Sequence, residues 1–457
     1  MYKEKILLKN CKIITPNEHT QKGFSIEIDN GIISSITHKT SSDGLVIDCS
    51  KKYVLPGFIN AHAHCYQNLM RSLGSDLNLI DWLKSAKYPI CKLMDKEDIF
   101  ISTIIAHLEM IRSGITTVID NFDFKNDLEG MRTLAKACEN SGMRVAIARG
   151  MRVRTRIAEE WKIPEWITPY DEKTELNISE QSVKELNGKF NGRLKIMLSP
   201  TALFYSTEDL LVGCQELSEK YKVCIHMHIA EGEDSQKACI KMFGKREIEF
   251  LNELRMLNEK FHAVHAIALS DYEINVLSLN GCTVIHNPIS NMYLATGISP
   301  IFKFIKKGIN VALGTDGAGS NDSYNFFETM KIASLLQKVI LKKPNVISSK
   351  EVFKMATLNG AKALLNEKIG EVKEGYKADL IILNLNKVSS FPDYKPLNNI
   401  VYSCNPSNVE HVIIDGEAIL LDGKFVKLDE NKLLEKFIKI VEKITLKIKN
   451  SLNLNEL

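Results

Sequence analysis

Alternating apolar and polar positions near both ends of the chain predict short β-strands joined by tight turns. Residues 26–36 form two such runs around Asn30-Gly31, a pair that the primed turns of β-hairpins favour. The same alternation returns within residues 378–426, where Asp-Gly supplies two further turns. We therefore expect residues 1–55 and 366–428 to build one small β-sandwich domain.

Between these ends, strand-like runs alternate with helix-like runs, as in successive βα units. Some helix ends are readable, such as Ser270 with Glu273 as a capping box and Gly281 beyond the helix. The eight strand candidates are residues 55–60, 115–120, 144–148, 194–198, 223–228, 262–265, 283–286 and 310–314. This order predicts an α/β fold, a (β/α)8 TIM barrel over residues 56–365, with its active site at the carboxyl ends of the strands.

The last segment, residues 429–457, has the pattern of an amphipathic helix. Its apolar residues recur at helical spacing with lysines between them: Leu433, Leu434, Phe437, Ile438, Val441 and Ile444. We expect this helix to cover the sheet domain. The alternative, a membrane-surface helix, requires a more strongly basic face.

Composition narrows the class of partner. The 457 residues are 44% hydrophobic and 25% charged, the balance of an ordinary folded protein, and the net charge is only +3. Such a charge does not supply the basic field that nucleic acid or an anionic membrane attracts, and no apolar run approaches the ~20 residues that cross a bilayer. We expect a cytoplasmic protein with a small-molecule partner, and homo-oligomerisation stays open.

The ten cysteines are scattered singly and form no C-x-x-C pair. They predict reduced, mostly buried thiols and no structural zinc framework. The deaminase signature of H-x-E followed by P-C-x-x-C is also absent from the sequence.

Histidines supply the candidate chemistry. Six of the eleven fall at or near predicted strand ends: His62, His64, His226, His228, His265 and His286. His62-x-His64 places two imidazoles on the same side of a strand, where both can bind one metal ion. An H-x-H pair alone is a weak signal, and a buried, hydrogen-bonded histidine accounts for one of the six but not for the set.

Several motifs carry a family resemblance that spans nearly the whole chain. They are residues 56–64 (PGFINAHAH), His228-x-x-Glu231, His286-Asn287-Pro288, residues 313–321 (LGTDGAGSN) and residues 370–380 (GEVKEGYKADL). In this order and spacing they resemble the amidohydrolase superfamily. The similarity is to the branch that contains S-adenosylhomocysteine and methylthioadenosine deaminases, s-triazine chlorohydrolases and related aminohydrolases.

The resemblance implies one divalent metal ion held by His62, His64, His228 and Asp316. Three imidazoles and a carboxylate suit Zn2+, with Fe2+ as the alternative, and the metal would shift the pKa of a bound water toward ~7. The resemblance further implies that Glu231 protonates a ring nitrogen. It gives His265 the polarisation of the water or the developing oxyanion, and Asp316 the proton transfer to the leaving group.

Two departures from the family pattern are informative. Two-metal members commonly use a carboxylated lysine at the end of strand four, but Lys195 lies at the beginning of that strand. We therefore expect a single metal ion. His226 shares a strand face with His228, and we expect it to pack behind the ligands, with direct metal contact as the less favoured alternative.

Substrate residues are less clearly marked. The resemblance implies that Asp81-Trp82 stands for a Glu-Trp pair whose glutamate binds ribose, and that Arg149 binds substrate. Thr201 stands where the nucleoside deaminases of the family usually have a histidine. Gln67 resembles the residue that the triazine and oxopurine enzymes have at its position. The expected substrate-binding set is Gln67, Asp81, Trp82, Arg149, Glu231, His286 and Asn287. Asp81-Trp82 is equally typical of an ordinary helix start with a core tryptophan.

Residues 151–181, which include Arg152, Arg154 and Arg156, are predicted to form a long loop over the barrel mouth. Long loops at that position often act as substrate lids, although charged loops are also ordinary solvated surface.

Three functions remain open. The first is a metal-dependent hydrolytic deaminase of a heterocyclic amidine, a purine or adenosine derivative such as S-adenosylhomocysteine or methylthioadenosine, that releases ammonia. The second keeps the metal site but acts on another substrate, as an s-triazine chloro- or aminohydrolase or a deaminase of oxopurines, guanine or pterins. The third, a metal-binding scaffold without activity, needs neither Glu231 nor His265 and is disfavoured.

Overall fold

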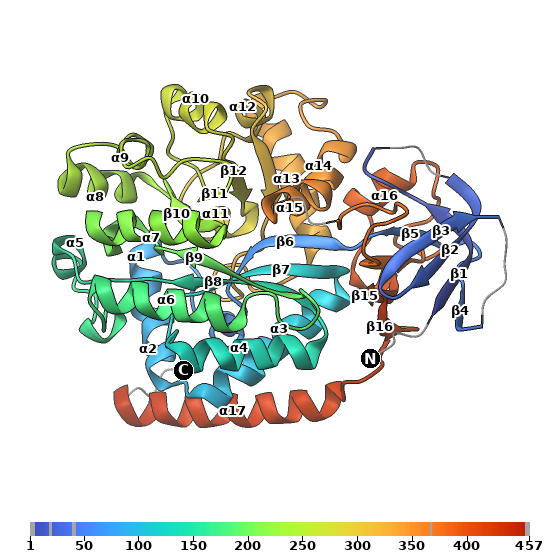
Figure 1. Ribbon diagram of the computed structural model, residues 1–457, viewed down its shortest axis with the longest axis horizontal. Helices are drawn as coiled ribbons and strands as arrows, with labels where there is room; N and C mark the ends of the chain where they lie inside the picture. The colour runs from blue at the N-terminus through green and yellow to red at the C-terminus, as the bar shows by residue number, and fades with distance from the viewer. Residues whose placement is uncertain (1–4, 18–20, 39–42, 366–367, 453–457) are drawn as a thin grey trace.

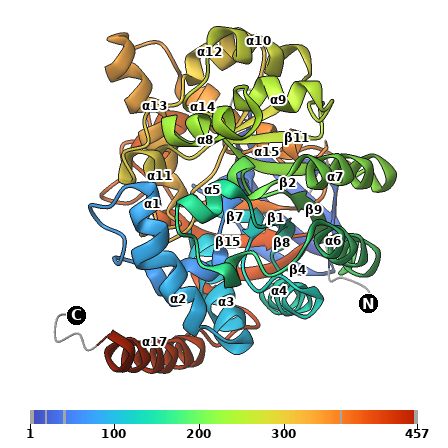
Figure 2. The ribbon, with the colours of Figure 1, turned by 90° about the vertical axis from the view of Figure 1, so that its left-hand side faces the viewer.

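The computed structural model describes residues 5–17, 21–38, 43–365 and 368–452. Within these residues, eight parallel strands pair in chain order and helices surround them, which is the arrangement of a TIM barrel (Figure 2). The strands are β6 (Phe58–Ala63), β7 (Ile115–Phe122), β8 (Arg144–Gly150), β9 (Leu194–Ser199), β10 (Ile225–Ile229), β11 (Phe261–His265), β12 (Thr283–His286) and β13 (Asn310–Leu313). After β13, the amides of Thr315 and Asp316 bond to the His62 carbonyl and bring the two ends of the sheet together.

The predicted barrel strands are confirmed to within a few residues, with one instructive difference. Residues 55–60 were expected to be a single strand, but the chain makes two, β5 (Tyr53–Pro56) and β6, on either side of Gly57. β5 belongs to the other sheet of the protein and β6 to the barrel. A Cβ at Gly57 would lie 2.2 Å from the Thr116 side chain, so only glycine allows the crossing.

The helices cover the barrel as in Figures 1 and 2. Those between β6 and β10 are α1 (Leu79–Trp82), α2 (Tyr88–Leu93), α3 (Lys96–Arg112), α4 (Leu128–Ser141), α5 (Arg156–Glu160), α6 (Glu172–Leu186) and α7 (Glu208–Tyr221). Those that follow are α8 (Glu233–Phe243), α9 (Glu247–Glu253), α10 (Asp271–Leu279), α11 (Pro288–Tyr293), α12 (Ile301–Lys306), α13 (Phe326–Leu341), α14 (Ser349–Met355), α15 (Leu358–Ala363) and α16 (Pro396–Tyr402). The short turns are η1 (Cys65–Met70), η2 (Leu83–Lys87), η3 (Glu165–Ile167), η4 (Leu203–Tyr205) and η5 (Pro406–Asn408). The predicted capping box of Ser270 and Glu273 begins α10.

Both ends of the described chain build the second sheet, as predicted, and it is a mixed sheet beside the barrel (Figure 1). Besides β5, its strands are β1 (Ile6–Ile13), β2 (Gln21–Asp29), β3 (Ile32–Thr37), β4 (Leu45–Asp48), β14 (Leu380–Leu383), β15 (Val409–Ile414), β16 (Glu417–Leu421) and β17 (Lys424–Phe425). The antiparallel pair of β5 and β14 joins the two ends of the chain.

The three predicted hairpin turns have the expected left-handed conformation. Both residues of Asn30-Gly31 have positive φ, at 52° and 85°, and the two Asp-Gly pairs match them. A Cβ on Gly416 would lie 2.4 Å from the Gly31 Cα, so a turn from one chain end packs directly on a turn from the other.

The C-terminal helix α17 (Glu430–Leu452) was expected to cover the sheet domain, and this expectation is wrong. The helix packs on α3 and α2 of the barrel instead (Figure 1). Its inward residues are Leu433, Phe437, Ile440, Ile444 and Ile448, whereas Leu434, Ile438 and Val441 are 41–48% exposed. Lys443 fixes the contact by bonding to Asp95, 3.0 Å away, and to Asp98.

The cysteines agree with the sequence analysis, because all ten are buried and free. In the part of the chain that the structure describes, no helix combines the length and apolarity that crossing a bilayer requires.

A buried ion pair joins the barrel to the mixed sheet. Arg144, the first residue of β8, donates to the Asp379 carboxylate over 2.7 and 3.0 Å, and it lies 3.4 Å from Asp415. Burial alone would raise the pKa of Asp379, but the Arg144 guanidinium lowers it below its usual range.

We predict that Arg144→Met lowers the free energy of unfolding by about 3–5 kcal/mol, because Asp379 would stay buried without its counter-charge. Urea unfolding followed by tryptophan fluorescence measures the loss. The folded pKa of Asp379 is lowered, so its ionic contribution exists above the unfolded pKa of about 3.9 and disappears as the pH falls through the folded value. The matched control Arg132→Met removes exposed pairs with Glu129 and Glu185 and should leave the free energy of unfolding close to that of the wild type. Equal losses in the two variants would contradict the structural role of Arg144.

Candidate metal centre and active-site pocket

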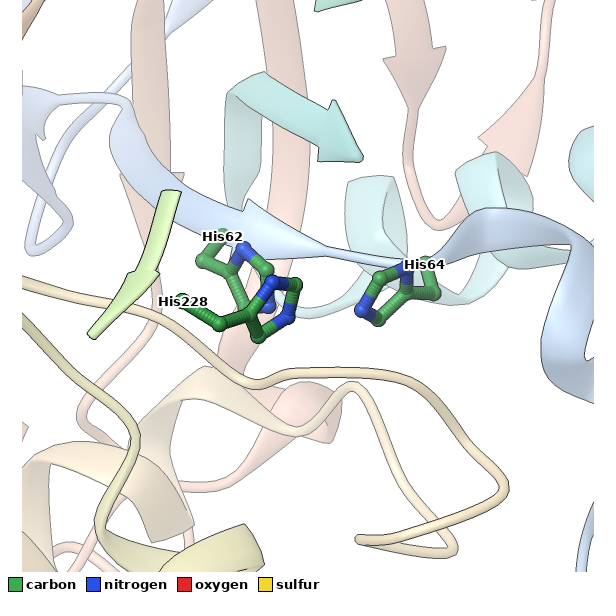
Figure 3. A group of neighbouring side chains, drawn as sticks. All are labelled: His62, His64 and His228. Atoms are coloured by element: carbon green, nitrogen blue, oxygen red, sulfur yellow. The ribbon is translucent and has the colours of Figure 1, made fainter. Parts of the chain in front are cut away.

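The predicted metal ligands meet at the carboxyl ends of the barrel strands. His62 lies in β6 and His64 directly follows it, while His228 lies in β10. Figure 3 shows these three imidazoles gathered around one point. Asp316 reaches the same point from the segment after β13, where its backbone adopts a left-handed φ of 63°.

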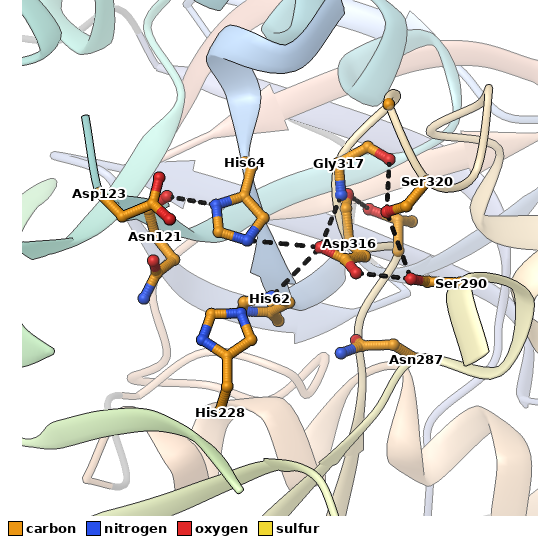
Figure 4. A network of polar contacts seen from close by, with 12 residues as sticks. His62, His64, Asn121, Asp123, His228, Asn287, Ser290, Asp316, Gly317 and Ser320 are labelled. Carbon is orange, nitrogen blue, oxygen red and sulfur yellow. Dashed lines mark hydrogen bonds and ion pairs between the residues drawn. The ribbon is translucent and has the colours of Figure 1, made fainter. Parts of the chain in front are cut away.

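The distances define a site that can hold a metal ion. Asp316 Oδ1 lies 3.3 Å from His62 Nε2 and 3.4 Å from His64 Nε2 (Figure 4). His62 belongs to two groups of residues that could hold a metal ion, and within each group the potential ligand atoms lie within 4.8 Å of one another. One group adds His64 and His228, and the other adds His265 and Asp316. Together they contain all four predicted ligands.

Hydrogen bonds to the opposite ring nitrogens orient the imidazoles. His64 Nδ1 donates to the Asn121 carbonyl over 2.6 Å, and His228 Nδ1 donates to the Thr201 carbonyl over 2.9 Å. Each Nε2 therefore keeps its lone pair for a metal. Burial lowers the pKa of His64 to about 3 and that of His228 well below its usual value, so both rings are neutral at pH 7.

Asp316 is held as an ionised acceptor. Ser290 Oγ donates to its Oδ2 over 2.6 Å and the Gly317 amide donates to its Oδ1 over 2.9 Å. Burial opposes the charge, but the nearby imidazoles of His62 and His64 hold the pKa of Asp316 well below its usual range.

Glu231 and His265 lie beside the ligands, with Glu231 Oε1 3.7 Å from His265 Nε2. Burial raises the pKa of Glu231, which favours its acid form. His265 Nδ1 donates to Asn291 Oδ1 over 2.8 Å, and its Nε2 is buried without a hydrogen-bond partner. The pair thus offers one carboxylic acid and one open imidazole nitrogen to the pocket.

His226 lies behind His62. Its Nε2 is 2.8 Å from His62 Nδ1, and its Nδ1 is 3.1 Å from His262 Nδ1. Three imidazoles therefore form a buried chain that starts at the predicted ligand His62. His262 was not among the predicted site residues. The available signals were its place on a predicted strand and its position three residues before His265.

A pocket opens beside the ligands. Its lining combines apolar rings with buried charges and consists of His64, Leu79, Trp82, Leu83, Lys87, Asp123, Arg152, Thr201, Ala202, Phe204, Tyr205, His228, Glu231, Leu294 and Asp316. Trp82 is fixed there by its indole N–H, which donates to the Gly319 carbonyl over 2.7 Å.

The structure brings only some of the predicted substrate residues to this pocket. Trp82 and Glu231 line it. Asp81 is exposed and bonds to Asn78, and Arg149 is buried against Glu175 at 2.6 Å; neither lines the pocket. A ribose-binding role for Asp81 stays a prediction.

The remaining predicted substrate residues lie behind the lining. Gln67 is buried against Gly317, and neither of its amide atoms has a partner. Asn287 approaches His265 Nδ1 at 3.4 Å, and both nitrogens of the buried His286 lack a partner. Residues 151–181 are not one long loop as predicted, because they contain α5, η3 and the start of α6. Arg152 alone among them lines the pocket, and a lid role for the segment stays a prediction.

Comparison with known proteins supplies the family. The amidohydrolase family matches residues 53–419. The chain belongs to this family. It is accordingly a hydrolase that acts on carbon–nitrogen bonds, as the sequence predicted.

Similar proteins cover the full length of the chain. A 5'-deoxyadenosine deaminase of Methanosarcina barkeri is 35% identical over 97% of this chain and 99% of its own. A 5-methylthioadenosine/S-adenosylhomocysteine deaminase of Caldicellulosiruptor saccharolyticus is 33% identical over 96% and 98%. Among solved structures, a zinc-bound adenosine deaminase from Xanthomonas campestris has a TM-score of 0.88 at 22% identity, covering 96% of this chain and 98% of its own. A triazine hydrolase from Arthobacter aurescens has a TM-score of 0.90 at 21% identity, covering 96% and 99%.

We predict that His226→Leu weakens metal binding about 10- to 100-fold, because His62 would lose the partner that orients its ring. Competition with a chelator of known affinity measures the change. The matched control is His107→Leu, since His107, in α3, is also buried but bonds to Ser141 at the end of α4, apart from the site. Wild-type metal affinity in His226→Leu would contradict the positioning role.

Proposed function

We propose that this protein is a metal-dependent deaminase that hydrolyses the amino group from a cyclic amidine of the purine or adenosine type and releases ammonia. The observation that carries the proposal is the placement of the Glu231 carboxyl 3.7 Å from His265 and beside the cluster of His62, His64, His228 and Asp316. Similar proteins named as deaminases of 5'-deoxyadenosine, 5-methylthioadenosine and S-adenosylhomocysteine support the substrate class.

We further propose one Zn2+ per chain, bound by His62, His64, His228 and Asp316. These side chains fit a zinc ion. The imidazole rings are neutral, their Nε2 atoms converge, and the buried His62 Nε2 has no hydrogen-bond partner among the described residues. Lys195 lies at the start of β9, away from the carboxyl end that a bridging ligand would occupy. When bound, the ion would lower the pKa of a water molecule toward ~7.

The chain's own residues supply the proton transfers. Glu231, favoured in its acid form, protonates the ring nitrogen and makes the amidine carbon electrophilic. His265 Nε2 accepts a hydrogen bond from the attacking water, because Nδ1 already donates to Asn291. The Asp316 carboxylate receives a proton and passes it to the departing amino group, which leaves as ammonia.

A second candidate keeps this site but takes a substrate without ribose, such as an oxopurine, guanine, a pterin or an s-triazine. The position of Asp81 favours it, because its carboxylate bonds to Asn78 outside the pocket lining. Ammonia release across a panel of nucleosides, free bases, pterins and triazines separates the two candidates.

The organisation predicted from sequence is kept as part of the proposal. We take residues 56–365 as the barrel and 1–55 with 366–428 as a β-sandwich. The separate core that β1, β2, β4, β14 and β15 share supports this interpretation. The ten buried free thiols agree with a reducing compartment and so support the cytoplasm as the place of action.

We predict about one tightly bound divalent ion per chain by elemental analysis. His64→Ala should lose metal and activity together, because the variant lacks one of the three converging imidazoles. The control His38→Ala changes an exposed histidine of the mixed sheet and should keep both metal and activity. Two ions held in the one site would contradict the single-metal proposal.

We predict that Glu231→Gln lowers kcat by about 10²–10⁴-fold, the usual contribution of general acid catalysis, with the metal content unchanged. Ammonia release and elemental analysis on the same preparation test both parts. Glu233→Gln, at the exposed start of α8, is the matched control. Wild-type turnover by Glu231→Gln would show that the ring acid is another group.

A further inference from the structure

A buried ionic cluster lines the wall of the pocket next to the metal site. Lys87 ends η2, Asp123 follows β7 and Arg152 follows β8, and all three side chains line the pocket. Their residues are only 3–4% exposed. Figure 4 shows Asp123 beside His64, so the cluster adjoins the proposed metal ligands.

Three donors already engage the Asp123 carboxylate. Its Oδ2 accepts from Lys87 Nζ over 2.8 Å and also from Arg152 Nη2, while its Oδ1 accepts from the Tyr66 hydroxyl over 2.6 Å. Burial would raise the pKa of Asp123, but Arg152 and Lys87 hold it well below its usual range. The carboxylate is therefore ionised and is bound by groups of the protein itself.

The two cations are not fully engaged. Arg152 Nε is buried without a partner, and Asp123 Oδ2 is the only acceptor bonded to Lys87 Nζ among the described residues. Arg152 stacks on the Tyr205 ring at 4.8 Å, which fixes its plane without satisfying its N–H groups. Thr201 Oγ1, another atom of the pocket lining, is also buried and unpartnered.

The charges of this wall do not balance. The neighbouring Glu175 carboxylate pairs with Arg149 at 2.6 Å, and neither of these two lines the pocket. Among the described residues, Lys87 and Arg152 therefore share one hydrogen-bonded counter-charge, the Asp123 carboxylate. A buried charge without a counter-charge is costly. Glu231 and Asp316 also line the pocket, but they belong to the proposed catalytic machinery and lie beside His265 and His62.

We infer that the Lys87–Asp123–Arg152 cluster is an anion subsite, and that the preferred substrate is an amino-heterocycle bearing a carboxylate or phosphate group. This inference rests on the proposed deaminase function and specifies its substrate class. The anion accepts from Lys87 Nζ and Arg152 Nε while the amidine lies at Glu231. Asp123 holds the two cations apart and oriented, and Thr201 adds a neutral donor.

The test compares substrates that differ in the anion. Metal-loaded enzyme is assayed for ammonia release with adenosine, adenosine 5'-carboxylate and adenosine 5'-monophosphate, which separate a carboxylate from a phosphate. Methylthioadenosine serves as a neutral substrate with a larger 5' group, so that size is not mistaken for charge. One anionic compound should exceed adenosine and methylthioadenosine in kcat/KM by at least 10-fold.

Lys87→Met keeps the length of the side chain and removes its charge. It should lower the ratio of anionic to neutral kcat/KM by about 10- to 100-fold, the range for a charge-assisted hydrogen bond. Lys84→Met, one turn earlier and exposed, is the matched control and should leave the ratio unchanged. Arg152→Gln provides a second test should Lys87→Met fail to fold.

Product binding distinguishes failure of this inference from failure of the proposed function. Calorimetry of inosine, inosine 5'-carboxylate and inosine 5'-monophosphate reports anion recognition without turnover. Tighter binding of an anionic product that Lys87→Met abolishes supports the subsite, even if no compound releases ammonia and the deaminase proposal fails. Ammonia release with a neutral preference, or an equal effect of Lys87→Met on neutral and anionic compounds, overturns the subsite and leaves the deaminase intact.

Discussion

The active site depends on keeping several imidazoles neutral inside the barrel with their Nε2 lone pairs directed at one point. Burial disfavours the charged ring, and the carbonyls of Asn121 and Thr201 accept the Nδ1 protons of His64 and His228. Both carbonyls lie at strand ends or directly beyond them, so the tautomers are set by the same backbone that positions the ligands. If the Nε2 atoms carried the protons instead, the N–H groups of the rings would point at one another and would repel a metal ion.

The mixed sheet contributes to the same geometry, although it supplies none of the proposed ligands. β5 is paired within that sheet, and one residue later, at Gly57, the chain becomes β6, which carries His62. Arg144 ties the start of β8 to Asp379 in the segment that leads into β14. The mixed sheet therefore fixes the amino ends of β6 and β8, whose carboxyl ends lead to the residues of the active site. A matched family segment of residues 53–419, which begins in β5, is consistent with the two sheets acting as one unit.

The sequence predicted what short-range patterns control. Strands, hairpin turns and the histidine motifs follow from local periodicity and spacing, and the structure confirms their positions. The sequence could not reveal which charged side chains pair with one another when loops distant in the chain pack together. Asp123 is a single charged residue and Arg152 belongs to an arginine-rich segment, and only the barrel brings the two together with Lys87. Arg149 was expected at the substrate, but Glu175 from α6 retains it in the interior. For α17, the helical spacing did not separate the residues that pack inward from the more exposed Leu434, Ile438 and Val441. Only the contact with α3 and α2 decides which of them are buried.

The pocket thus has two electrically different walls built from separate parts of the barrel. Glu231, His265 and Asp316 come from strand ends β10, β11 and β13, whereas Lys87, Asp123 and Arg152 come from segments after β6, β7 and β8. During deamination, positive charge develops on the ring beside Glu231, and the cationic wall opposes the reverse orientation of such a substrate. Among the described residues, no hydrogen bond joins the charged side chains of the two walls, but Asp123 lies close enough to His64 for its charge to act on that ring.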